Sequence, residues 1–174
     1  MVWTPDHLPD DAKKWHPLRT RDGEEVPTFR RTEWSPERRK AAHEKIVGWH
    51  PRVRLRSDCA GYNCVGMAFA HRRAWIEDEQ IRPILAHDGY RRLPEFSLAE
   101  EGDIIVYVSM QNGRLAPSHV AVVLQRKIVE SSDDWSGIMV LSKWGQHGEY
   151  IHRMEDVHLY LGRPEECWTE RKRS

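Results

Sequence analysis

The chain has 174 residues, which is enough for one domain with a core and too few for two of ordinary size. Its 27 Lys and Arg residues balance 27 Asp and Glu residues, so the net charge gives no general attraction to nucleic acid or to an anionic membrane. Three cysteines, an odd number, argue against a disulfide framework, and no apolar stretch approaches the about 18 residues of a membrane helix. We therefore expect one folded domain without a nucleic-acid or membrane partner.

The first 34 residues predict an irregular arm that precedes the domain. They carry four of the ten prolines and many charges, and Trp3, Trp15 and Trp34 are candidates to pin the arm to the domain. The stretch 1–21 has no apolar core and does not resemble a signal peptide. We expect a cytoplasmic protein by default, and export by a leaderless route stays open.

The domain is predicted to span 35–165 and to begin with a helix. Ser35 is a favourable N-cap, Pro36 suits the first helical position, and Glu37 places an acid in the first turn. Gly48 is a plausible stop, so this helix is expected over 36–47.

A second, central helix is predicted to begin at Cys64. Apolar residues recur from there at helical spacing as far as Trp75, and almost nothing polar stands between 64 and 70. Asn63 is a favourable N-cap, which would place the Cys64 thiol in the first turn, where the helix dipole stabilises a thiolate. Gly66 inside this helix predicts that a strand or a substrate packs very close.

The second half of the chain predicts a sheet. A short helix is expected from Ile81 to near Gly89, and Ser97 with Glu100 suggests a capping box for one more turn. Continuous apolar runs then predict paired central strands at 104–108 and 119–124 around the turn 111–113, a third strand at 138–142 after a polar loop at 130–136, and edge strands at 150–152 and 157–161. Helices followed by an antiparallel sheet define an α+β fold.

A cysteine and a histidine are the candidate catalytic residues. Period two places His119, Ala121 and Val123 on one face of the second strand, and if this face covers the Cys64 helix, His119 meets Cys64. The imidazole would take the thiol proton, and the thiolate would attack a carbonyl. The alternative is a buried structural thiol and a satisfied histidine.

The order of these motifs resembles the papain-like cysteine amidase and peptidase group of the NlpC and CHAP types. A capped helix bearing Cys64 is followed by the strand from Gly102-Asp103 and by the strand from Ser118-His119-Val120-Ala121, over roughly 57–144. The segment Tyr62-Asn63-Cys64, the segment 142–145 and the late Ile151-His152 are similar to an uncharacterised bacterial branch of that group. The resemblance implies a papain-like fold, with a buried cysteine-bearing helix packed on an antiparallel sheet.

By the same resemblance, Cys64 is the nucleophile, His119 is the base, and the substrate is an amide or isopeptide bond cleaved through a thioester. The substrate would be a peptide or a peptidoglycan-like amide. Cys59 is a rival nucleophile, because the segment 58–61 is similar to the NlpC signature Asp-Cys-Ser-Gly. The residue that orients the histidine falls at Ser142, Lys143 or Gln146.

Other residues have simpler interpretations. Asn63 and Trp144 are candidates to line a substrate cleft, and Cys167 stands in a predicted charged tail at 166–174. The histidines lack the paired spacing of a zinc site, so we expect neither a metal nor another cofactor. Of the candidates for the residue that orients the histidine, the serine and the lysine are not obvious acceptors for an imidazolium. An alternative from another class therefore stays open, a non-catalytic binding or toxin-associated module on the same fold that has a protein partner.

Overall fold

The computed structural model describes residues 12–14, 16–127 and 137–172. The predicted loop at 130–136 lies outside the described residues, as do Trp3, Trp15 and Trp135.

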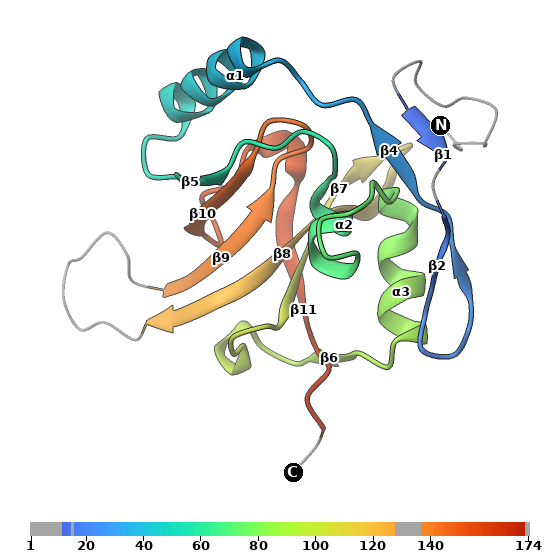
Figure 1. Ribbon diagram of the computed structural model, residues 1–174. Coiled ribbons are helices and arrows are strands. Elements are labelled where there is room, and N and C mark those ends of the chain that lie inside the picture. Colours follow the sequence, from blue (N-terminus) through green and yellow to red (C-terminus); the bar gives the residue numbers. More distant parts are fainter. Residues whose placement is uncertain (1–11, 15, 128–136, 173–174) are drawn as a thin grey trace.

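The described residues form a mixed α+β fold with one large antiparallel sheet (Figure 1). Within them the sheet has seven strands in the order β5-β10-β9-β8-β7-β11-β6. The helices are α1 (Pro36–Trp49), α2 (Cys64–Phe69) and α3 (Ile81–His87), and the sheet strands are β5 (Arg54–Ser57), β6 (Arg91–Leu93), β7 (Ile104–Gln111), β8 (Arg114–Lys127), β9 (Gly137–Lys143), β10 (Glu149–Arg153) and β11 (Arg163–Thr169). The α+β prediction is confirmed at this level.

Helix α1 begins where the sequence predicts it. The Ser35 side chain accepts a hydrogen bond from the Arg38 backbone N–H, and Pro36 stands at the start of the helix. The helix runs to Trp49, past Gly48, because glycine at a helix end costs only about 1 kcal/mol.

Helix α2 is shorter than predicted. It ends at Phe69, and after the C-cap residue Ala70 the residues His71 and Arg72 have positive φ angles of 49° and 65°, which reverse the chain. Trp75 is therefore not on this helix, and it forms an isolated bridge with Phe29 instead. The predicted close approach at Gly66 is present, because a Cβ there would lie 1.7 Å from the Ala74 carbonyl oxygen. The close neighbour is the returning chain, and is neither a strand nor a substrate.

The central hairpin follows its prediction, and the smaller elements differ. Asn112 and Gly113 have φ angles of 49° and 77°, as the tight turn between β7 and β8 requires. Strand β10 is interior, since β5 pairs with its outer side. The predicted edge strand at 157–161 is instead a 3-10 turn, η4 (Leu159–Leu161), and the Ser97 hydroxyl bonds Glu95 in place of capping a helix.

The arm before α1 is more ordered than predicted. Two short antiparallel pairs occur in it, β1 (Ala12–Lys14) with β4 (Phe29–Arg31) and β2 (Leu18–Arg19) with β3 (Glu25–Val26). Val26 and Phe29 are buried, so apolar burial fixes this segment on the domain.

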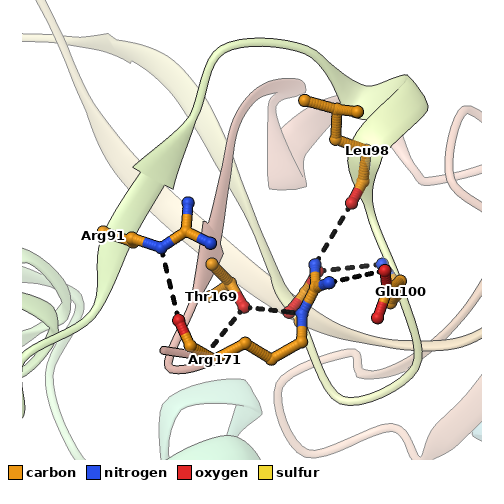
Figure 2. Close-up of polar contacts among 6 residues, drawn as sticks. Arg91, Leu98, Glu100, Thr169 and Arg171 are labelled. Carbon is orange, nitrogen blue, oxygen red and sulfur yellow. Dashed lines mark hydrogen bonds and ion pairs between the residues drawn. The ribbon is translucent and has the colours of Figure 1, made fainter. Parts of the chain in front are cut away.

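The chain end is also part of the sheet. Strand β11 lies between β7 and β6, and Cys167 on it is buried. After the strand, Arg171 binds Asp103 (Nη2–Oδ2 2.6 Å), Glu100 (Nη1–Oε1 2.6 Å) and the Leu98 carbonyl, and Figure 2 shows this cluster. The prediction of a charged tail from 166 was wrong for 166–169, because these residues belong to β11, which pairs with β7 and β6, and Glu166 is paired with Arg82 at 2.7 Å.

Two cores cover the two faces of the sheet. On one face, Tyr107, Ala121 and Val140 pack with Ile46 of α1. On the other face, Val106 and Val120 pack with α2 and α3, which lie side by side in Figure 1, and Leu141 packs with Met67 of α2. Among the described residues, no helix is long and apolar enough to cross a membrane.

Candidate functional site

Cys64 occupies the predicted first position of α2. The Asn63 side-chain oxygen accepts the Gly66 N–H at 3.0 Å, so the predicted N-cap is present. Burial raises the pKa of the Cys64 thiol above its ordinary value, and Asp78 raises it further, while backbone N–H groups including that of Val120 oppose the shift. The thiol is therefore neutral at physiological pH.

His119 is fully buried on β8, and neither of its ring nitrogens has a hydrogen-bond partner among the residues that the structure describes. Its ring lies beside Tyr107, with centroids 5.2 Å apart, and the two residues are opposite each other in the β7–β8 register. Burial lowers the pKa of His119 to about 3, and the neighbouring His152 contributes in the same direction. The ring is uncharged at neutral pH.

The structure does not join Cys64 and His119 by a hydrogen bond. Alternation places His119 on the face of Tyr107 and Ala121, which pack in the core under α1, whereas Cys64 packs with Val120 in the other core. The expectation that the His119 face covers the Cys64 helix was wrong. Both faces of β8 are apolar, so sequence alone did not show which face α2 covers.

Ser142 orients a different histidine. Its Oγ lies 2.7 Å from the Nε2 atom of His152 and accepts a hydrogen bond from Trp144 Nε1 at 2.8 Å. The Nδ1 atom of His152 lies 2.7 Å from the Arg153 carbonyl, which can only accept, so Nδ1 carries the proton and Ser142 donates to Nε2. Burial lowers the pKa of His152 to about 4. Trp144, Ser142 and His152 thus form a neutral, buried network.

Lys143, the next residue, points to the α2 face and is fully buried. Its Nζ donates to the Gly145 carbonyl and lies 5.3 Å from the centroid of the Tyr62 ring. Among the described residues no carboxylate lies within ion-pair distance of it. Burial lowers the pKa of Lys143 to about 8.

Glu149, opposite Lys143 in the β9–β10 pair, is a buried acid that sequence reasoning missed. It accepts from Tyr62 Oη at 2.6 Å and from Arg72 Nε at 2.6 Å, and Arg56 lies 3.5 Å from its second oxygen. The sequence did contain a signal for Glu149: a turn at Gly145 between two strands places Glu149 opposite Lys143.

Cys59, the rival nucleophile, is half-buried and lies outside any helix. Its thiol donates to the Glu33 carboxylate, with 3.1 Å between Sγ and Oε2. Burial raises the pKa of Cys59, the Gly61 N–H opposes this, Glu33 adds to it, and Lys143 also opposes it. Glu33 belongs to the arm, and no periodicity in the sequence relates it to Cys59.

The remaining candidate residues are buried or partly buried. Trp144 is fully buried in the core under α1, and Asn63 is buried with its side chain bonded to the Ile76 backbone. Within the described residues, the Gln146 side-chain nitrogen is buried without a hydrogen-bond partner, so it does not bond His119. In the described parts of the chain, no group of three or more His, Cys, Asp and Glu side chains has the geometry to hold a metal ion.

Comparison with known proteins gave no match: no family model, no curated protein and no solved structure is significantly similar to this chain.

Proposed function

We propose that this chain is a non-catalytic binding domain on a papain-like core of helix and sheet. The observation that carries the proposal is the state of the candidate catalytic pair. Both side chains are buried and uncharged, and no hydrogen bond joins them. A thiol amidase needs a thiolate and an imidazolium at working pH.

The other thiols support the same proposal. The pKa of each of the three cysteines is raised, Cys64 and Cys59 and Cys167 alike, and burial is the largest cause in every case. None of them has the low pKa of a reactive cysteine. All three are free, which suits the reducing cytoplasm that we propose as the location.

A thiol amidohydrolase is the second candidate. It is favoured by the capped position of Cys64 and by the Val120 N–H, which stabilises the thiolate form of that residue. Such an enzyme would require the β8 backbone to rearrange around His119, because a side chain in a paired strand keeps its face, so that the imidazole could take the Cys64 proton. The thiolate would add to the amide carbonyl, and the amine would leave with that proton, giving a thioester that water then cleaves.

Site-resolved iodoacetamide labelling against pH separates the two candidates. Wild type and His119→Ala are labelled, and each rate is divided by the rate for the same cysteine in urea. The binding domain predicts slow labelling of Cys64 at about pH 6 in both proteins. Fast labelling of Cys64 in wild type that disappears in His119→Ala would overturn the proposal in favour of the amidohydrolase.

A further inference from the structure

The Glu33 carboxylate is bound by two consecutive residues of the turn before α2. Its Oε1 accepts the Ala60 backbone N–H at 2.5 Å, and its Oε2 accepts the Cys59 thiol at 3.1 Å. Both oxygens of one carboxylate are thus engaged by donors of a single turn. This is the arrangement in which a turn binds a free carboxylate group.

Two cations interact electrostatically with these groups. The Arg39 Nη1 atom lies 3.9 Å from Glu33 Oε1, and it also lies 3.3 Å from Asp58. Lys143 is fully buried, interacts electrostatically with both Cys59 and Glu33, and has no ion pair of its own within the described residues. A buried cation without an ion-pair partner favours an anion nearby, because its own desolvation is uncompensated.

Gly61, the third residue of the turn, also lies close to the carboxylate. A Cβ at this position would lie 3.4 Å from Glu33 Oε2 and 3.9 Å from Cys59 Sγ, which are ordinary contact distances. The carboxylate therefore packs against the turn as well as accepting its hydrogen bonds. The two donors and the two cations together form a site for one carboxylate group.

Glu33 itself is poorly buried, although the site holds it. It lies between β4 and α1, outside every helix and strand, and its side chain is 43 % exposed. The neighbouring Trp34 is held separately, by Arg38 over its ring at 4.1 Å and by an edge contact with His147. The arm therefore stays attached if the Glu33 side chain leaves the site.

We propose that the turn 59–61 is a binding site for the carboxylate of a peptide ligand, and that Glu33 occupies this site in the free protein. The proposal names the ligand class of the binding domain and rests on that function. A tethered side chain has an effective concentration in the millimolar range, so a ligand must add contacts outside the carboxylate to displace it.

The test uses the full chain with Glu33→Gln, and the readout is the iodoacetamide labelling rate of Cys59. Removing the adjacent negative charge should raise this rate by about three- to tenfold, since the thiol loses a partner that stabilises its protonated form. The control is Glu44→Gln on the exposed side of α1, where the carboxylate is 65 % exposed and lies 3.9 Å from Lys40. It should leave the Cys59 rate unchanged.

Small acids then probe the emptied site. N-acetylglycine carries a terminal carboxylate, N-acetylglutamate α-amide carries a side-chain carboxylate, and N-acetylglycinamide carries neither. At constant ionic strength, at least one acid should slow Cys59 labelling in Glu33→Gln by twofold or more and leave wild type unaffected. The acid that protects better identifies the source of the carboxylate. No slowing by either acid, or equal slowing by the amide, would overturn the site.

Two further measurements keep the test decisive. Arg39→Gln combined with Glu33→Gln should reduce the protection, because it removes the cation 3.9 Å from the carboxylate, and it checks the site even if the arm loosens in the single variant. Intact mass measured during incubation with N-acetylglycinamide should show no adduct. An acetylglycyl thioester on Cys59, formed with release of ammonia, would overturn the non-catalytic assignment and leave the carboxylate site standing.

Discussion

Ser142 and Lys143 are neighbours on β9, yet they enter opposite faces of the sheet and two different kinds of network. Ser142 lies on the face under α1 with His119, His152 and Trp144, and these four side chains are neutral. Lys143 lies on the α2 face opposite Glu149, which binds Arg72 and Tyr62, so that face is charged. Both residues are fully buried.

The two faces show two solutions to the cost of burying polar groups. On the neutral face, burial lowers the pKa values of His119 and His152, so both rings are uncharged at neutral pH. On the charged face, hydrogen-bond donors surround the Glu149 carboxylate. The predicted catalytic pair takes Cys64 from one face and His119 from the other. The sheet that separates the networks therefore also separates the two residues.

Among the variants of the two faces, Glu149→Ala on the charged face should lower the free energy of unfolding most. It leaves Arg72 without its carboxylate and removes the acceptor of Tyr62, so we expect a loss of about 3 to 5 kcal/mol in the free energy of unfolding in urea. Glu165→Ala is the control, because Glu165 is 40 % exposed and lies 3.4 Å from Arg163. It should cost less than about 0.5 kcal/mol. Equal losses in the two variants would contradict a charged network.

The sequence predicted the helices, turns and strands better than it predicted which face of the sheet α2 covers. The Ser35-Pro36-Glu37 start and the Asn112-Gly113 turn are local signals, and both are confirmed. The runs 104–108 and 119–124 are apolar on both faces, so no alternation indicated which face α2 covers. The contact of Glu33 with Cys59 spans 26 residues and follows no periodicity.

Ser142→Ala should break the neutral face. The variant leaves the Trp144 indole N–H without its acceptor and the His152 Nε2 without its donor, both in the core. Two unsatisfied buried groups predict a loss of about 2 to 3 kcal/mol in the free energy of unfolding. Ser97→Ala removes an exposed hydroxyl bonded to Glu95 and should stay within about 0.5 kcal/mol. If Ser142→Ala matches this control, the network does not stabilise the core.

His119→Leu tests how the neutral face affects stability at acidic pH. The folded pKa of His119 is about 3 and the ordinary value is 6.5, so between these values the unfolded chain binds the proton and the folded protein does not. Stability is therefore lost as the pH falls from about 6.5 towards 3, and at pH 5 this histidine costs about 2 kcal/mol. The stability difference between pH 8 and pH 5 should shrink by that amount in the variant. An unchanged difference would show that His119 is not buried as a neutral ring.

Lys143→Met should have the smallest effect and the opposite sign. Methionine keeps the volume and removes a buried charge, while Glu149 keeps Arg72 and Tyr62, so we expect a gain of up to about 1 kcal/mol at pH 7. The folded pKa of Lys143 is about 8 against 10.5, so between these values the unfolded chain holds more protons and wild type gains stability as the pH rises. The advantage of the variant should therefore disappear towards pH 10.5. If the variant loses more than about 2 kcal/mol in the free energy of unfolding at pH 7, Lys143 stabilises the fold. If the variant is more stable, Lys143 does not stabilise the fold, and its charge is explained by the binding of an anion.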